Sequence, residues 1–152
     1  MTGKTANDDQ SPLKRRTISS SAPTSYRACV RLRCEDKHTE LTLARTPGNK
    51  WTVDGAPRPH LDGLADVDLS VTPSTNTPVI RRLRLTVGQS AEVTAAWVRL
   101  PSLDVVALRQ RYRRVSASTY EYEAPSLDFV TKLECDDDGV VLAYGGLWKK
   151  LP

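Results

Sequence analysis

At 152 residues, the chain is long enough for one domain with a hydrophobic core and too short for two domains of ordinary size. Hydrophobic residues make up 39% and charged residues 26%, and the ten prolines and eight glycines favour a turn-rich β protein over a helical bundle. The net charge is +4, but both signs of charge are interspersed beyond residue 26, so nucleic acid is not an expected partner.

Three features bear on the cellular compartment. The cysteines, Cys29, Cys34 and Cys135, are odd in number and lack close spacing, which favours reduced thiols over a disulfide framework. No apolar segment typical of a signal peptide follows Met1, and no apolar stretch has the length of a transmembrane helix. We therefore expect a cytoplasmic protein without a transmembrane segment.

The first 25 residues are rich in serine, threonine, lysine and arginine, and Leu13 and Ile18 are the sizeable apolar residues among them. Such a segment buries too little apolar surface to offset the entropy lost on ordering. We predict a disordered polar tail over residues 1–25 and a single domain over residues 26–152.

The domain begins with a pattern of period two, which is the spacing of a half-buried strand. The apolar residues of 28–34 alternate with arginines and Cys29, Leu41 and Leu43 mark a second strand, and residues 51–53 a third. Proline, glycine, asparagine and aspartate separate and follow these segments, as in tight turns. The pattern predicts a meander of three strands.

Residues 64–71 form the next extended segment. Thr77 and Pro78 then predict the start of a helix, because threonine caps helices and proline is tolerated in the first turn. Residues 79–85 supply about two helical turns, which end before Gly88. The β-branched residues of this segment would also suit a strand.

Beyond Gly88 the extended pattern resumes. Extended segments are expected over residues 91–101, 103–116, 119–124, 129–135 and 140–151. The acidic run Asp136–Gly139 predicts a tight hairpin turn between the last two. The chain is therefore predicted to be mainly β, as a long antiparallel meander with one short helix.

Asp66 and Asp68 lie two residues apart on a predicted strand, so their carboxylates share a face. Paired carboxylates serve in acid–base catalysis or bind cations, but no further ligand follows at a supporting spacing. Arg81 and Arg82 are close enough in sequence to neutralise the pair. A structural network of aspartate and arginine is favoured over a catalytic or metal site.

Other candidate motifs favour ordinary structural roles. Arg109, Arg111 and Arg113 alternate along one predicted strand, which indicates a solvated face more often than a phosphate-binding one. His38 and His60 lie in polar segments without a nucleophile motif or a zinc spacing. The acidic turn lacks the remaining ligands of a calcium loop. We expect no catalytic residue, no metal and no cofactor.

Several motifs in the second half of the chain recur in one order. They are LDG at 61–63, DVDLS at 66–70, TP at 72–73, TNT at 75–77, IRRL at 80–83, AEV at 91–93, VRLP at 98–101, RQRY at 109–112 and an extended match over 128–148. In this order the sequence resembles the Putative glycolipid-binding family of bacterial and fungal proteins. The resemblance extends back toward Tyr26 and covers about four-fifths of the chain.

The resemblance implies a spiral β-roll, in which an antiparallel sheet wraps one helix, as in lipoprotein carriers. It also implies a lipid or glycolipid ligand held in the hollow of the sheet, and a homodimer. Family members carry further strands before the one that matches Tyr26, where this chain has a polar tail. The implied roll is therefore incomplete, with an unpaired sheet edge.

The residues implied to contact a ligand are polar or aromatic, and all fall in or beside the matching motifs. They are Asp66, Asp68, Asn76, Arg81, Arg82, Trp97, Arg111, Tyr112, Tyr120 and Tyr122. The leading hypothesis is a non-enzymatic lipid- or glycolipid-binding protein. The alternative is an interaction protein that dimerises through its open sheet edge without a ligand, and an enzyme that uses Asp66 and Asp68 ranks third.

Overall fold

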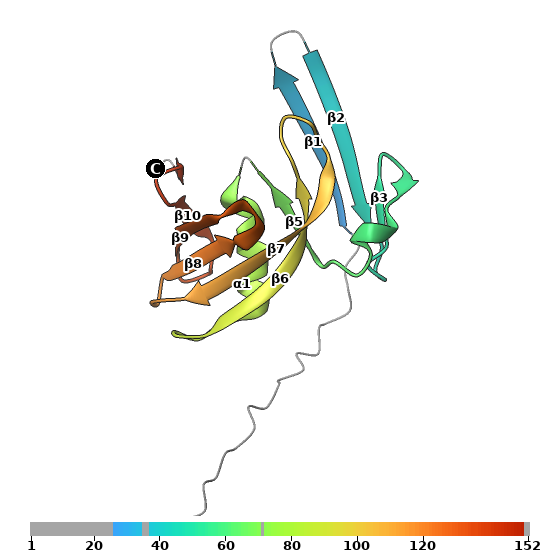
Figure 1. The fold of residues 1–152 in the computed structure, drawn as a ribbon. Coiled ribbons are helices and arrows are strands. Elements are labelled where there is room, and N and C mark those ends of the chain that lie inside the picture. Colours follow the sequence, from blue (N-terminus) through green and yellow to red (C-terminus); the bar gives the residue numbers. More distant parts are fainter. Residues whose placement is uncertain (1–25, 35–36, 71, 151–152) are drawn as a thin grey trace, which may run out of the picture.

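The computed structural model describes residues 26–34, 37–70 and 72–150, which fold into two β-sheets and one α-helix (Figure 1). The predicted tail over residues 1–25 lies outside the described residues. A mainly β fold with one short helix is confirmed, and most elements lie within a few residues of the predicted segments.

The smaller sheet is an antiparallel meander in the order β1-β2-β3-β4. Its strands are β1 (Tyr26–Cys34), β2 (Lys37–Arg45), β3 (Trp51–Val53) and β4 (Ala56–Pro57). β1 and β2, each nine residues long, form a hairpin that extends away from the larger sheet in Figure 1. Leu41 and Leu43 alternate with less buried neighbours, which is the pattern that predicts β2.

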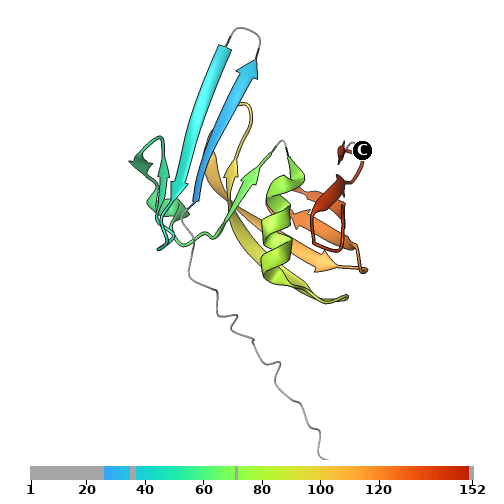
Figure 2. The same cartoon turned by 180° about the vertical axis from the view of Figure 1, so that it is seen from behind.

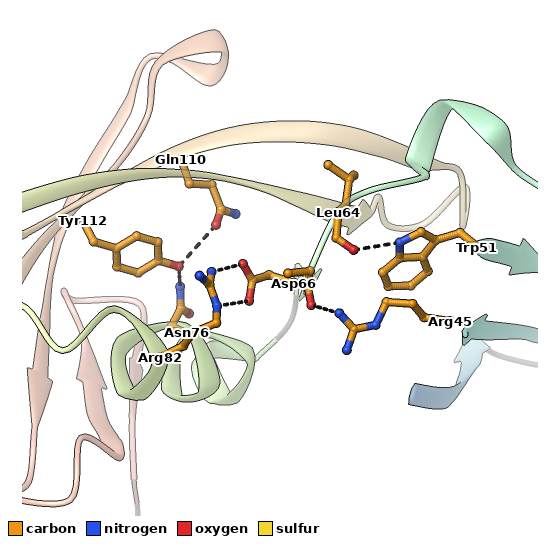
Figure 3. A network of polar contacts seen from close by, with 9 residues as sticks. Arg45, Trp51, Leu64, Asp66, Asn76, Arg82, Gln110 and Tyr112 are labelled. Atoms are coloured by element: carbon orange, nitrogen blue, oxygen red, sulfur yellow. Dashed lines mark hydrogen bonds and ion pairs between the residues drawn. The ribbon is translucent and has the colours of Figure 1, made fainter. Parts of the chain in front are cut away.

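Trp51 and Arg45 fasten the smaller sheet to the segment that precedes β5 (Figure 3). The Trp51 indole Nε1–H donates to the carbonyl of Leu64 at 3.0 Å. The Arg45 guanidinium lies 5.8 Å from the centre of the Trp51 ring and donates to the carbonyl of Ala65 at 2.5 Å. These contacts fix one end of β5 relative to the smaller sheet.

The larger sheet has seven strands in the order β11-β10-β9-β8-β7-β6-β5. They are β5 (Asp66–Leu69), β6 (Ser90–Val98), β7 (Val105–Arg114), β8 (Thr119–Ala124), β9 (Phe129–Cys135), β10 (Val141–Tyr144) and β11 (Trp148–Lys149). Of two short 3-10 turns, η1 (Pro59–Leu61) lies between β4 of the smaller sheet and β5, and η3 (Pro125–Leu127) lies between β8 and β9. The sheet curls around the helix and forms an open half-barrel (Figures 1 and 2).

The pairing of β5 with β6 is parallel, so the predicted antiparallel meander does not hold at this pair. Parallel neighbours require a long crossover connection, which is usually helical. Here the 3-10 turn η2 (Pro73–Thr75) runs directly into α1 (Asn76–Leu83) and carries the chain from the end of β5 back to the start of β6. Hydrophobic periodicity marks a strand but does not identify its partner.

Helix α1 lies on the concave side of the half-barrel (Figure 2). Its buried apolar side chains are Val79, Ile80 and Leu83. The sequence predicts Thr77 as its cap, but the cap position lies two residues earlier, at Thr75, and the helix begins at Asn76. The Thr77 hydroxyl instead accepts a hydrogen bond from the backbone N–H of Val141 at 3.1 Å, which ties the helix start to β10.

Apolar side chains form two cores, one on each side of β6. Because successive strand residues point to opposite faces, Ala96 and Val98 face the smaller sheet, whereas Val93 and Trp97 face α1. The core against α1 contains Val79, Ile80, Leu83, Leu85, Leu108, Tyr112, Tyr120, Tyr122, Ala124, Leu133, Cys135 and Val141. The core under the smaller sheet contains Leu41, Leu43, Trp51, Val53, Leu61, Ala96, Val98 and Leu103.

Candidate functional site

Polar side chains from four elements meet on the concave side of the half-barrel. Asp68 comes from β5, Gln110 and Tyr112 from β7, Tyr122 from β8 and Asn76 from the first turn of α1. On β7 the alternation of the strand turns Gln110 and Tyr112 inward and the intervening arginines outward. The curl of the sheet and the crossover helix therefore assemble a polar cluster inside an otherwise apolar core.

The cluster is a chain of hydrogen bonds that ends on Asp68. The Asn76 amide Nδ2 donates to the Tyr112 hydroxyl at 2.8 Å, and that hydroxyl donates to Gln110 Oε1 at 3.2 Å (Figure 3). The Gln110 amide Nε2 then donates to Asp68 Oδ2 at 2.6 Å. Tyr122 also donates its hydroxyl to Asp68 Oδ2, at 3.4 Å. Each buried amide is thereby oriented by its neighbour.

The environment of Asp68 favours its neutral form. Burial raises the pKa of this carboxyl, and the hydrogen bonds from Gln110 and Tyr122 lower it by less. Burial also raises the pKa of Tyr112 and of Tyr122, and the nearby Asp68 charge adds to both shifts. The two phenols therefore remain protonated and act as hydrogen-bond donors.

Asp66, the other carboxylate on β5, has a different partner. The guanidinium of Arg82 on α1 binds Asp66 through two nitrogens. Its Nε lies 3.3 Å from Asp66 Oδ1, and its Nη2 contacts Oδ2 (Figure 3). The predicted aspartate–arginine network therefore exists for Asp66. Asp68 takes only neutral donors among the described residues, although both carboxylates belong to the same short strand.

A cavity of about 140 Å³ adjoins the cluster. It is bounded by the end of β5, by η2 with the start of α1, and by β10 with β11. The lining residues are Asp68, Leu69, Ser70, Thr72, Pro73, Asn76, Tyr144, Leu147 and Trp148. Asp68 and Asn76 thus belong to both the hydrogen-bonded cluster and the cavity wall, which also contains the aromatic side chains of Tyr144 and Trp148.

Two other aromatic rings pack against Tyr144. The Tyr144 ring stacks on Phe129 with 6.0 Å between centroids and 14° between planes. Its centroid also lies 6.0 Å from that of Tyr122. Burial raises the pKa of Tyr144, so its hydroxyl remains a donor. Tyr144 is therefore held between the cavity and the apolar core.

Several residues implied by the family resemblance come together in this part of the structure, and two of them, Asp68 and Asn76, line the cavity. Asp68, Asn76, Tyr112 and Tyr122 form the hydrogen-bonded cluster, and Asp66 and Arg82 lie beside it. Trp97 joins through Ser70, because its Nε1–H donates to the Ser70 hydroxyl at 2.7 Å. Sequence reasoning missed Gln110 as a site residue. The only signal was its spacing of two from Tyr112.

Three other implied residues lie elsewhere. Arg81 donates to the backbone carbonyl of Asp138 at 2.7 Å, on the hairpin that joins β9 and β10. Tyr120 belongs to the core against α1, with the Arg114 guanidinium 5.5 Å from its ring centre. Arg111 lies on the convex face of β7.

The convex face of β7 carries a row of ion pairs. Arg109 pairs with Glu92 of β6 at 2.5 Å, and Arg111 and Arg113 pair with Glu123 and Glu121 of β8 at 2.7 and 3.1 Å. The bonds to Arg113 lower the pKa of Glu121. A solvated strand face, the interpretation favoured from the sequence, is confirmed for these arginines.

Among the described residues, side chains of His, Cys, Asp and Glu nowhere form a group of three or more suited to a metal ion. In the same part of the chain, no helix combines the length and the apolar character needed to cross a bilayer. The acidic run Asp136–Gly139 is the predicted turn between β9 and β10, closed by a hydrogen bond from the Gly139 N–H to the Asp136 carbonyl at 3.0 Å.

The fold defines a class of mainly β proteins in which an open half-barrel wraps one helix. A family model described as Putative glycolipid-binding matches residues 19–150, and the chain belongs to this family, which confirms the resemblance. The chain is similar to the crystal structure of a DUF1089 family protein from Pseudomonas aeruginosa, with 38% identity and a TM-score of 0.69. The match covers 77% of this chain and 65% of that protein. No curated protein matches the chain.

Proposed function

We propose that this protein binds the polar head group of a glycolipid in the cavity beside Asp68, and that it holds this ligand without transforming it. The observation that carries the proposal is the position of Asp68, a largely buried carboxylate in the wall of a cavity. A buried acceptor that faces a cavity is costly unless a donor enters and completes its hydrogen bonds. Membership of the family supports a glycolipid as the class of ligand.

The cavity wall suits a sugar. Sugar hydroxyls donate and accept hydrogen bonds. They can therefore donate to the side-chain oxygen atoms of Asp68 and Asn76, which line the cavity. The aromatic side chains of Tyr144 and Trp148 line the same cavity. Their apolar faces provide a surface for the C–H groups of a sugar ring, while the polar side fixes its orientation.

The rim of the cavity suits the start of an alkyl chain. Leu147 lines the cavity and is 72% exposed, so it offers apolar surface at the mouth. The interior of the half-barrel is already filled by Val79, Ile80 and Leu83 of the helix. The cavity is also smaller than the roughly 300–1,000 Å³ of pockets that enclose drug-sized ligands. The alkyl chain is therefore assigned to the outside of the half-barrel, against Leu147.

The first test is to extract natively purified, folded protein with organic solvent and to analyse the extract by mass spectrometry. A stoichiometric glycolipid is the expected result. A titration calorimetry experiment then compares octyl β-D-glucoside with methyl β-D-glucoside, which has the same sugar without the chain. The octyl compound is expected to bind more tightly because its first methylenes contact Leu147.

Trp148→Ala provides a matched test of the site. Removal of the ring is expected to weaken the binding of octyl β-D-glucoside by about fivefold, since an aromatic contact contributes on the order of 1 kcal/mol. Leu127→Ala, which truncates an exposed apolar side chain outside the cavity, serves as the control and should leave binding unchanged. Equal affinities for Trp148→Ala and the unaltered protein, or no binding by a folded protein, would overturn the proposal.

The edge position of β1 favours a second candidate function, self-association. Among the described residues, β1 pairs with β2 alone, so one side of a nine-residue strand carries no partner. An open edge of this length is a template for pairing with another strand. Light scattering is expected to show a dimer with no ligand bound, and a strictly monomeric protein would contradict this candidate.

A further inference from the structure

The two carboxylates of β5 differ in charge compensation. Asp66 forms an ion pair with Arg82, whereas Asp68 accepts hydrogen bonds from the neutral groups of Gln110 and Tyr122. A buried carboxylate without a cation is costly when ionised, because neutral donors replace only part of the solvation that water supplies. Of the two carboxylates, Asp68 is therefore the one whose ionisation costs more free energy, and it is also the one that lines the cavity.

No described element supplies the missing cation. The titratable groups that face Asp68 are Asp66 on β5, Tyr112 on β7, Tyr122 on β8 and Tyr144 on β10. The facing residue of α1 is the neutral Asn76, and the guanidinium of the same helix, Arg82, is engaged by Asp66. No lysine or arginine is among the described residues that line the cavity. The neighbourhood of Asp68 is thus acidic or neutral on every side.

The geometry leaves one carboxylate oxygen for a ligand. Both hydrogen bonds to Asp68 end on Oδ2, and Oδ1 receives none from the described residues. Tyr144 and Trp148 line the same cavity as Asp68. Aromatic ring faces carry negative electrostatic potential and attract cations, ammonium groups in particular. A carboxylate that shares a cavity with two such rings suits a positive group.

We infer that the head group bound in this cavity carries a positively charged nitrogen, as an amino sugar does, which pairs with Asp68 and lies against Tyr144 and Trp148. This inference rests on the proposed function and narrows the class of its ligand. The ammonium supplies the charge that Arg82 supplies to Asp66. Occupancy therefore completes a second ion pair on β5.

The affinity of the cavity for an ammonium group should depend on pH. The pKa of Asp68 is raised in the free protein, so acid protonates this carboxyl and removes the charge that holds the ligand. Affinity for an ammonium is therefore expected to rise as pH increases through the pKa of Asp68 and to fall again where the amine loses its proton. A neutral sugar lacks this dependence, because an amide or a protonated carboxyl also bonds to hydroxyls.

The test compares octyl 2-amino-2-deoxy-β-D-glucoside with octyl β-D-glucoside by titration calorimetry. The two probes share the chain and the ring and differ in one ammonium. At neutral pH the amine is expected to bind at least about tenfold more tightly, because its ammonium adds a charged hydrogen bond to Asp68. Asp68→Asn should abolish this preference while it retains the neutral glycoside. The control Asp137→Asn, in the exposed hairpin turn, should keep the preference.

The outcomes separate the inference from the proposed function. Equal binding of both probes to the unaltered protein would overturn the inference and leave the glycolipid proposal standing. Failure of a folded protein to bind either probe would overturn both. Should Asp68→Asn fail to fold, the unaltered protein still decides, because affinity for the amine must weaken between about pH 7 and pH 4 while affinity for the neutral glycoside stays constant. A parallel decline for both probes would also refute the inference.

Discussion

The convex face of β7 exposes Arg109, Arg111 and Arg113, each paired with a glutamate of a neighbouring strand. The concave side of the same sheet buries Asp68 with neutral donors alone. The convex charges are more numerous, but they are solvated and mutually compensated, so they stabilise the sheet weakly and leave nothing for a ligand. On the concave side Asp66 has Arg82 as its partner, whereas Asp68 receives no cation from the described residues, and such a group is expected where a ligand completes the structure.

The largest expected difference between the two faces is in packing. Leu133→Ala removes a fully buried side chain from the concave side of β9 and is expected to lower the free energy of unfolding by about 2–5 kcal/mol. Val130→Ala on the same strand is the matched control, because Val130 is 61% exposed, and should change the free energy of unfolding by less than about 0.5 kcal/mol. Urea denaturation measures both, and equal losses would contradict the assignment of the two faces.

A smaller effect is expected when a buried carboxylate loses its cation. Arg82→Gln leaves the nearly buried Asp66 without a positive partner, and the free energy of unfolding should fall by about 1–3 kcal/mol. The estimate is reduced because the Arg82 side chain is partly exposed, so water screens the pair. The convex counterpart Arg109→Gln should have little effect on urea unfolding. A loss for Arg109→Gln as large as that for Arg82→Gln would show that the two ion pairs do not differ in burial.

Asp68→Asn is expected to raise stability at neutral pH. A carboxyl whose pKa is higher in the folded than in the unfolded protein binds protons more readily when folded, so the stability of the unaltered protein falls as pH increases through that pKa. The amide has no such penalty. The advantage of the variant should shrink as pH decreases toward 3.8, the ordinary pKa of this carboxyl. Urea unfolding at several pH values measures the difference, and a constant difference would rule out Asp68 as the titrating group.

The smallest effect is expected on the convex face. Arg111→Gln breaks an exposed ion pair with Glu123 and should change the free energy of unfolding by less than about 1 kcal/mol. It should also leave the affinity for octyl β-D-glucoside unchanged, because Arg111 points away from the cavity. Weakened binding by this variant in calorimetry would place the ligand on the convex face and would reverse the comparison between the two faces.

Much of the fold was predictable because burial alternates along its strands. Residues 119–124 and 129–135 were expected as strands and are β8 and β9. The parallel pairing of β5 was not predictable, because its partner is fixed by the crossover through α1 and not by the pattern of β5 itself. The two cores were equally hidden, since the period of two separates inward from outward residues but does not say what covers each face.

The candidate site was predictable only in part. Asp66 and Asp68 stood out because charged residues interrupt an apolar strand, and Arg82 was near in sequence. Gln110 could not be recognised, because the sequence does not show that its face of the strand is buried. Arg111 was misleading, because the sequence does not show that its face is the convex one. Which side of β7 faces the core depends on the pairing of β7 with β6 and β8, and that register is long-range information.

The cavity is built from segments distant in sequence, since Asp68 lies on β5 and Trp148 on β11, the first and last strands of the larger sheet. It is complete only when β11, a strand of two residues, has joined β10. Short terminal strands of a sheet open most readily, at a small fraction of the global unfolding free energy. A ligand that contacts Trp148 would add its binding free energy to this weakest pairing. Hydrogen exchange at β10 and β11 would then slow on binding, and the edge of the sheet would become the part of the molecule that reports occupancy.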